Sequence, residues 1–276
     1  MATLTLLGTG ACEGIPAPFC TCNLCTYARA HGGKDRRRRF AVLLNEETLV
    51  DFGPDIMPAF RELGHDETHV RRILMTHSHL DHFQPEEMVY LACNEHANPV
   101  RLYCNREIHQ ALQEQFVRFK SQNASLTIHL NEPGHEVFDE DWGILPVRST
   151  HGENGEQTVV YCVTAPDGHK ALILSDTGWL PESSWQQLAG VEADAAVIEM
   201  SFGIHEPYNH EKAYHLGATS ALEMLEKLRS LHALKPHALC VTAHISHCSN
   251  TRHAELEQWF QNTGCQPGYD GFSQAF

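Results

Sequence analysis

The heptapeptide THSHLDH, which runs from Thr76 to His82, decides the fold of this chain. It follows a short apolar run and brings three histidines and one aspartate together within six residues. The imidazoles of His77 and His79 can serve one metal ion, and Asp81 with His82 can serve a second. A histidine-rich surface loop is the alternative interpretation. The acidic residue between the histidines and the β-like run before them favour a metal site at a strand end.

The composition indicates a soluble globular protein. The chain has 276 residues, of which 42% are hydrophobic, and we find no linker that would divide it, so we expect one domain spanning residues 1–276. No apolar run reaches the length of a membrane span, so we expect no membrane partner. The first residues lack the basic start and apolar core of a secretory signal. We therefore expect a cytoplasmic protein whose ten cysteines are reduced thiols or metal ligands.

The net charge limits the choice of partner. A formal charge of −15 argues against a nucleic acid polymer, because such binding relies on many contacts from Lys and Arg to phosphates. It remains compatible with a small anionic substrate, since bound divalent metals reverse the local sign.

Three further potential ligands also follow β-like runs. His151, Asp176 and His244 come after the predicted strands 144–148, 170–174 and 238–242. Functional residues often lie on loops held by a rigid sheet. A buried aspartate without a partner would be costly, so metal ligation explains Asp176 well, and capping of the following helix is the alternative.

Hydrophobic periodicity predicts an α/β layered fold, with sheets covered by helices. The predicted strands span residues 4–7, 40–44, 48–51, 72–75, 100–104, 125–130, 144–148, 157–163, 170–174, 195–199 and 238–242. The predicted helices span residues 54–63, 85–92, 106–119, 183–188, 217–231 and 252–260. We expect Phe116 and Phe119 to pack in the core, with a pocket lining as the alternative.

Cys20, Cys22 and Cys25 supply three of the four ligands that a structural zinc needs. The residues themselves leave the fourth ligand open, and unliganded thiols are the alternative. The candidates for the fourth position are His31, Cys12, Cys248 and His247. We expect the remaining cysteines to be packing residues, namely Cys93, Cys104, Cys162, Cys240 and Cys265.

The charged run from Asp35 to Arg39 contains four consecutive arginines. We expect a solvated basic loop. The alternative is that one or two of these arginines contact a phosphate or an adjacent acidic element.

Taken together, these motifs resemble the metallo-β-lactamase superfamily, with THSHLDH as its H-x-H-x-D-H motif. The resemblance covers essentially the whole chain, and its other elements are Gly8-Thr9-Gly10, Asp51-Phe52-Gly53, Ser175-Asp176-Thr177 and Thr242-Ala243-His244. It implies an αβ/βα four-layer sandwich with the site at one edge of the paired sheets. Within the superfamily the chain looks most like the PhnP-like phosphodiesterases, because of Phe19 to Cys25 and of His244-Ile245-Ser246-His247.

The resemblance also implies a ligand set. His77, His79 and His151 would bind one metal, Asp81, His82 and His244 a second, and Asp176 would bridge the two. The ions would be zinc or manganese. A third, structural zinc would take His247 as its fourth ligand and would tie the loop 20–25 to the segment 244–247.

The implied activity is hydrolysis of a small phosphodiester, assisted by Asp81 and Asp176 at the metals. The most specific form is conversion of 5-phosphoribosyl 1,2-cyclic phosphate to ribose 1,5-bisphosphate in phosphonate catabolism, by a homodimer. His215, at the start of a predicted helix, would contact the phosphate and act as general acid. A helix-start histidine without function is the alternative, and His210 is a less favoured substitute.

Four other functions compete with this one. Extra sequence at 94–131 and differences after residue 201 allow another diester, such as a nucleotide or a cyclic nucleotide. A lactone or thioester hydrolase would use the same ligands, because metal-activated water also attacks carbonyls. A tRNA-processing nuclease would need a basic arm, which the net charge disfavours. A non-catalytic PqqB-like protein would lack the complete histidine motif that is present here.

Overall fold

The computed structural model describes residues 1–94, 99–119, 125–152, 155–205 and 214–276. The strands of one sheet are β1 (Thr3–Gly8), β2 (Ala41–Leu44), β3 (Thr48–Val50), β4 (Arg72–Leu74), β5 (Val100–Cys104), β6 (Leu126–Leu130) and β14 (Ser273–Ala275). Those of the other are β7 (Val137–Asp139), β8 (Trp142–Arg148), β9 (Val159–Thr164), β10 (Lys170–Leu174), β11 (Ala193–Glu199), β12 (Leu234–Ala243) and β13 (Gln266–Pro267).

The described helices flank these sheets. They are α1 (Asn23–His31), α2 (Ile56–Leu63), α3 (Pro85–Cys93), α4 (Arg106–Phe119), α5 (Glu182–Leu188), α6 (Ala218–Ser230) and α7 (His253–Trp259). Short 3-10 turns occur at η1 (Gly33–Asp35), η2 (Glu67–His69) and η4 (His247–Ser249).

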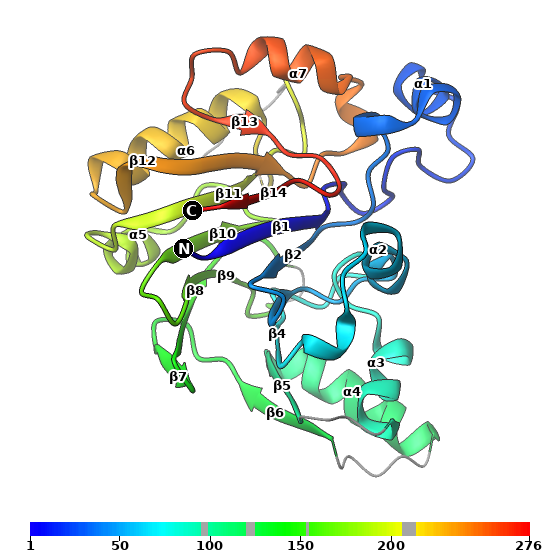
Figure 1. Cartoon of the computed structure of the whole chain (residues 1–276), viewed down its shortest axis with the longest axis vertical. Coiled ribbons are helices and arrows are strands. Elements are labelled where there is room, and N and C mark those ends of the chain that lie inside the picture. The colour runs from blue at the N-terminus through cyan, green and yellow to red at the C-terminus, as the bar shows by residue number, and fades with distance from the viewer. Residues whose placement is uncertain (95–98, 120–124, 153–154, 206–213) are drawn as a thin grey trace.

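The two sheets face each other, and helices cover both outer faces (Figure 1). The strand orders are β14-β1-β2-β3-β4-β5-β6 and β13-β12-β11-β10-β9-β8-β7. The alternation of side chains along the inner strands explains this arrangement. Ala171 and Ile173 of β10 pack in the core between the sheets, whereas Leu172 and Leu174 pack in the core beneath the helices. Because both faces of such strands are apolar, both must be covered.

The predicted α/β sandwich in one domain is therefore confirmed. Every predicted strand and helix is present, with each end within four residues of its predicted position. Four elements escaped prediction: α1, β7, β13 and β14. The missed strands have two or three residues, and β7 and β14 are mostly exposed, so they lack the apolar run that revealed the equally short β3 and β4. Helix α1 begins inside the cysteine cluster, where the Cys22 side chain accepts a hydrogen bond from the Cys25 backbone N–H at 3.4 Å.

Two packing predictions are only partly correct. Phe116 is buried, but Phe119 is 46% exposed, because it ends the helix that carries both. Four of the five cysteines expected in the core are buried, whereas Cys93 is exposed at the end of α3.

The arginine run is not a solvated loop at Arg37. That side chain is buried and donates to the Thr9 Oγ1 at 2.8 Å and to the Gly268 carbonyl at 2.7 Å. The alternative, that one or two of these arginines contact an adjacent acidic element, is correct for its neighbours. Arg38 lies 3.4 Å from Asp270, and Arg39 lies 3.0 Å from Asp55. These pairs fix the segment before β2 against the rest of the sandwich.

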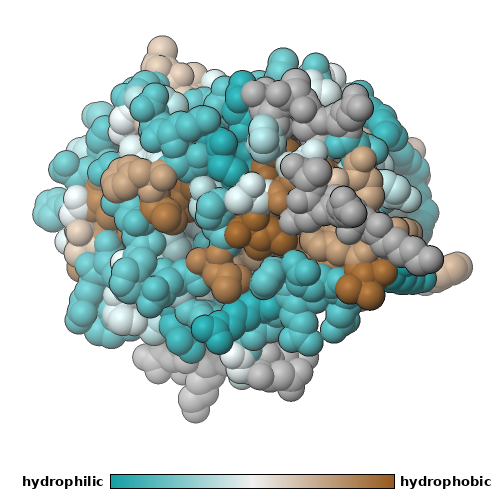
Figure 2. All heavy atoms as spheres, turned by 90° about the horizontal axis from the view of Figure 1, so that it is seen from below, coloured by the Kyte–Doolittle hydropathy of each residue, from teal (hydrophilic) through white to brown (hydrophobic). Residues whose placement is uncertain are grey.

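The surface is mostly hydrophilic, with separate apolar patches when the molecule is seen from the lower end of Figure 1 (Figure 2). Exposed apolar side chains on the elements at this end include Tyr90, Val117, Leu130 and Phe138. None of the described helices is both long and apolar enough to cross a membrane.

Candidate metal centre

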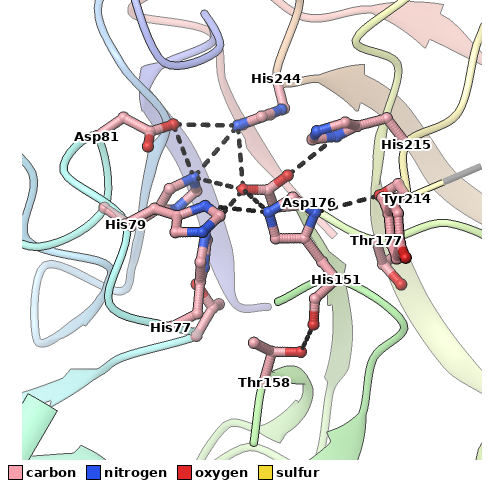
Figure 3. Close-up of polar contacts among 12 residues, drawn as sticks. His77, His79, Asp81, His151, Thr158, Asp176, Thr177, Tyr214, His215 and His244 are labelled. Atoms are coloured by element: carbon pink, nitrogen blue, oxygen red, sulfur yellow. Dashed lines mark hydrogen bonds and ion pairs between the residues drawn. The ribbon is translucent and has the colours of Figure 1, made fainter. Parts of the chain in front are cut away.

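Four strand ends meet at one edge of the sandwich. The loop after β4 carries the heptapeptide, and His151, Asp176 and His244 follow β8, β10 and β12. Their side chains point toward one another (Figure 3). The structure therefore brings together all the predicted metal-ligating residues, although they are up to about 170 positions apart in the sequence.

The first group of potential ligands is His77, His79, His151 and Asp176, whose ligand atoms all lie within 4.8 Å of one another. The His77 Nε2 is 3.0 Å from the Asp176 Oδ2. The His151 Nε2 is 3.0 Å from the His79 Nδ1 and 3.5 Å from the same Asp176 oxygen.

The second group is Asp81, His82, His244 and again Asp176. The His82 Nε2 lies 3.1 Å from the Asp81 Oδ2 and 3.2 Å from the Asp176 Oδ2. It also lies 3.2 Å from the His244 Nε2. One carboxylate oxygen, the Asp176 Oδ2, therefore belongs to both groups and is positioned to bridge two metal ions.

Hydrogen bonds to residues around the centre orient two of its imidazoles, so that their Nε2 atoms point toward the potential metal site. The His82 Nδ1 is 2.7 Å from the buried Asp51 Oδ2, and the His244 Nδ1 is 2.9 Å from the Ser201 Oγ. Asp51 also accepts hydrogen bonds from the backbone N–H and the hydroxyl of Thr76, at 2.8 and 2.9 Å. Such partners fix the tautomer and the ring orientation of a metal-ligating histidine.

These contacts fit a pair of divalent cations. When His82 is neutral, with its proton on Nδ1, its Nε2 lone pair faces another imidazole nitrogen and two carboxylates, and either protons or metal cations must lie between these groups. The His77 Nε2 is buried and makes no well-aligned hydrogen bond among the described residues, although the Asp176 Oδ2 lies 3.0 Å away. Nitrogen and oxygen donors of this kind suit zinc and manganese.

The backbone is strained at three of these positions. Asp51, Asp176 and His244 adopt left-handed conformations with φ of 66°, 50° and 57°. Each such residue costs roughly 1–3 kcal/mol and persists where the surrounding structure holds it in place. The strain allows each side chain to turn back toward the centre directly after its strand.

The carboxylates keep protons on two of the imidazoles in the metal-free cluster. Burial alone would lower the pKa of His244, but Asp176 and Asp81 raise it to about 9. Burial opposes protonation of His82 as well, while Asp81 and Asp51 raise its pKa well above the ordinary value. Both imidazoles are therefore protonated at pH 7, and a metal ion must displace these protons.

We accordingly expect manganese binding at pH 7 to release protons. Calorimetric titration in PIPES and in Tris, which differ in ionisation enthalpy, should give heats that differ in proportion to the protons released. As the pH rises through about 9, His244 loses its proton before binding, so the release should shrink and the affinity should rise. Equal heats in both buffers at pH 7 would contradict this account.

Glu199 is a site residue that the sequence analysis missed. It ends β11, is fully buried, and places its Oε2 3.0 Å from the His215 Nδ1 and 3.4 Å from the His244 Nδ1. The His215 Nδ1 is also 3.0 Å from the Asp176 Oδ1. An acidic residue at the end of an apolar strand was the signal that could have revealed it. Burial alone would lower the pKa of His215, but Glu199 and Asp176 raise it to about 11.

Glu199→Gln should lower the pKa of His215 toward its ordinary value, because it removes one of the two buried carboxylates that lie 3.0 Å from the His215 Nδ1. It should also weaken metal binding by roughly 10- to 100-fold, the usual effect of losing an outer partner of a ligating histidine. NMR titration of the metal-free protein and competition with a chelator measure the two effects. Glu226→Gln, on the exposed face of α6, is the matched control. An unchanged His215 pKa would refute the role of Glu199.

The cysteine cluster lies against the C-terminal segment. The ligand atoms of Cys20, Cys22, Cys25 and His247 all lie within 4.8 Å of one another, with the His247 Nδ1 3.5 Å from the Cys20 Sγ. Of the other candidates for the fourth position, the His31 Nδ1 lies 3.0 Å from the Tyr27 carbonyl oxygen. Cys12 and Cys248 are exposed and lie outside this group.

Two alternatives can be assessed directly. Asp176 does not cap the following helix, because Pro181 occupies the N-cap position of α5. His210 lies outside the described residues, so the structure places only His215 near the centre.

The sequence and the fold have known counterparts. Residues 47–242 match the sequence profile of the beta-lactamase superfamily domain. No curated protein is a significant match to the chain. Among solved structures, a diphosphatase of the PhnP family has a TM-score of 0.78 at 24% identity, covering 100% of this chain and 98% of that one.

Two further structures are similar over their whole length. Zinc-bound PqqB from Methylobacterium extorquens has a TM-score of 0.74 at 16% identity, covering 99% of this chain and 100% of that one. The short form of human tRNase Z has a TM-score of 0.68 at 17% identity, covering 99% and 98%. Identities this low show a shared fold and leave the reaction to be argued from the site.

Proposed function

Because the chain belongs to the β-lactamase superfamily, whose domain matches more than half of it, we propose that it is a metal-dependent hydrolase of small phosphodiesters. The observation that carries this proposal is the position of Asp176. Its Oδ2 lies within 3.7 Å of a ring nitrogen of each of four histidines, which come from three different loops. A carboxylate shared in this way is suited to hold two cations side by side.

The proposed metal residues are those of the two groups above: His77, His79 and His151 at one position, Asp81, His82 and His244 at the other, and Asp176 between them. Two divalent ions bound there would supply a hydroxide nucleophile from water at neutral pH and would neutralise negative charge on the phosphoryl oxygens.

The protein itself supplies the proton for the leaving group. His215 is protonated at neutral pH, because Glu199 and Asp176 hold its Nδ1–H and raise its pKa. Its side chain is 28% exposed, so the ring remains accessible from the site. We propose that the Nε2–H of His215 contacts the phosphate and donates to the departing alkoxide. A general acid of this kind contributes about 10²–10⁴-fold to the rate.

The structural neighbours guide the choice of substrate. The diphosphatase of the PhnP family supports phosphorus esters or anhydrides over carbonyl compounds. The most specific candidate remains 5-phosphoribosyl 1,2-cyclic phosphate, hydrolysed to ribose 1,5-bisphosphate in phosphonate breakdown. A diphosphate ester is the second candidate, favoured by the same neighbour.

Phosphorus NMR of the zinc- or manganese-loaded protein tests the proposal. The substrates are the cyclic sugar phosphate, bis(p-nitrophenyl) phosphate and a nucleoside diphosphate. Turnover of a diester that falls about 100-fold or more in His215→Ala for a poor leaving group, and much less for p-nitrophenolate, supports both the reaction and the acid. Failure with all three substrates, with both metals bound, would reject the proposal in favour of lactones or thioesters.

We also propose that Cys20, Cys22, Cys25 and His247 hold a structural zinc. Four such donors match a tetrahedral site, and His247 lies three residues after His244. Hydrogen bonds already join the N-terminal and C-terminal segments, since the Ala11 N–H donates to the Ile245 carbonyl at 3.0 Å and the Leu24 N–H donates to the Asn250 Oδ1 at 3.3 Å.

Cys22→Ser should lose this zinc and lower the melting temperature by several degrees or more, because binding of a structural zinc also stabilises the fold. Metal analysis should show one zinc fewer per chain, with the active-site ions retained. Cys93→Ser, on α3, is the matched control. Unchanged zinc content in Cys22→Ser would reject the proposed site.

A homodimer is proposed on resemblance alone. Light scattering at micromolar concentration decides it.

A further inference from the structure

We propose that Glu156 is a positioning residue of the metal centre, which holds the loop of His77 and His79 against the loop of His151. The inference concerns the geometry of one metal position. It rests on the proposed metal centre and is independent of the substrate that the protein hydrolyses.

Both oxygens of the Glu156 carboxylate accept hydrogen bonds from Ser78. The Ser78 backbone N–H donates to the Oε1 at 2.8 Å, and the Ser78 hydroxyl donates to the Oε2 at 2.9 Å. Hydrogen bonds to an ionised acceptor are about twice as strong as those between neutral groups. Ser78 stands between His77 and His79, so these bonds fix the short segment that joins two potential ligands of the first group.

Glu156 lies in the connection between β8 and β9, which also carries His151. The Val159 N–H in the same region donates to the Thr76 carbonyl at 3.1 Å. The Thr158 hydroxyl donates to the His151 carbonyl (Figure 3). Glu156 and Val159 therefore attach this connection to the heptapeptide at two points, while Thr158 fixes the backbone at His151.

Asn105 supports the Glu156 carboxylate from a third segment. Its Nδ2 donates to the Glu156 Oε1 at 2.6 Å and to the Gln157 carbonyl at 3.2 Å. The Asn105 side chain is buried, and its Oδ1 accepts a hydrogen bond from the Ile108 N–H in the first turn of α4 at 2.9 Å. Asn105 directly follows β5, which pairs with β4, so the carboxylate is anchored beside the loop that carries the heptapeptide.

A half-buried carboxylate with several hydrogen bonds can also serve only the stability of its loop. The place of these contacts distinguishes the two roles. They join the chain segments of the first group, whereas the second group has its own hydrogen bonds with Asp51 and Ser201. Loss of Glu156 should therefore weaken metal binding at the first position much more than at the second. A role in stability alone would affect both positions equally or neither.

Zinc titration of the full chain against a competing chelator tests the proposal. Long-range ¹H–¹⁵N NMR of the histidine rings follows the two groups separately, and thermal unfolding of the metal-free variants checks that each is folded. Asp194→Ala is the matched control. Asp194 is another half-buried carboxylate that accepts a backbone hydrogen bond, from the Lys170 N–H at 3.0 Å, at the ends of β10 and β11 remote from the metal centre.

Glu156→Ala should lower the zinc affinity of the first position by roughly 10-fold or more, as for other losses of a residue that supports a metal ligand. Ser78→Ala, which removes only the hydroxyl contact, should cause a smaller loss at the same position. Glu156→Gln should retain most of the affinity. Its amide oxygen can accept from the Ser78 N–H and from Asn105, while its NH₂ donates to the Ser78 hydroxyl oxygen.

Three results would overturn the positioning role of Glu156. They are an unchanged first position in Glu156→Ala, an equal loss at both positions, and a loss in Glu156→Gln or in Asp194→Ala as large as that in Glu156→Ala. A wild-type protein that binds no zinc at either histidine group would instead reject the metal centre on which the inference rests.

Discussion

Asp176→Asn should abolish assembly of the two-metal centre. The Asp176 Oδ2 lies 3.0 Å from the His77 Nε2 and 3.2 Å from the His82 Nε2, so it faces both groups of potential ligands. The substitution removes the negative charge that both positions share but keeps the side-chain size. It also keeps the backbone, since asparagine tolerates the left-handed conformation that Asp176 adopts at φ 50°.

The expected loss of metal affinity is larger than the loss caused by removing a residue that only hydrogen-bonds to a metal ligand. Removing an outer partner of a metal ligand costs about 10- to 100-fold, so removing a shared ligand should cost at least 100-fold in metal affinity and in diester turnover. Metal analysis after dialysis should find at most one ion at this centre. Asp141→Asn, at an exposed position between β7 and β8, is the matched control. Retention of two ions by Asp176→Asn would show that this carboxylate is not a bridge.

Asp139→Ala should destabilise the fold by about 3–5 kcal/mol, the cost of removing one partner of a buried ion pair. The Arg72 side chain is 0% exposed, and its Nε lies 3.0 Å from the Asp139 Oδ2. The Arg101 Nε lies 2.7 Å from the same oxygen. Asp139 is on β7 of one sheet, and the arginines are on β4 and β5 of the other, so the cluster joins the two sheets.

Glu140→Ala tests whether the stabilisation depends on burial of the carboxylate or only on its charge. Glu140 contacts the same Arg72 at 3.0 Å but is 55% exposed, so its removal should cost no more than about 1 kcal/mol. Urea unfolding of both variants measures the difference in the free energy of unfolding. Equal losses in the two variants would contradict the argument from burial.

The destabilisation by Asp139→Ala should also depend on pH. Burial would raise the pKa of Asp139, but the hydrogen bonds from Arg72 and Arg101 outweigh it and lower the pKa. The ion pair therefore contributes fully above the ordinary aspartate pKa of about 4, and its contribution is lost as the pH falls through the lowered value. The difference between wild type and Asp139→Ala should be constant from pH 5 to 7 and should shrink below about pH 4.

Local sequence patterns were enough to predict the layers and most of the site. Strands such as β10 alternate between two apolar faces, which requires cover on both sides and predicts a layered sandwich. A polar residue directly after an apolar strand identifies a strand-end ligand, and this pattern identified His151, Asp176 and His244. The spacing of Cys20, Cys22 and Cys25 predicted a metal-binding cluster in the same way.

Other features depend on which distant residues meet. The sequence left four candidates for the partner of the cysteines, and the structure places His247 beside them, 227 residues from Cys20. Glu199 lies at the end of an apolar strand, but only its contacts with His215 and His244 show its role. The Asp139 cluster likewise requires the two sheets to face each other.

The sequence by itself therefore determined most of the secondary structure, the α/β class and the identity of most site residues at the strand ends. The physical reason is that side-chain periodicity and the cost of burying an isolated charge act within a few residues of the chain. The tertiary structure alone decided that the Asp176 Oδ2 lies against both groups of potential ligands and that Glu199 contacts two histidines. These are consequences of strand order and of left-handed turns after the strands, which bring together residues that no local pattern connects.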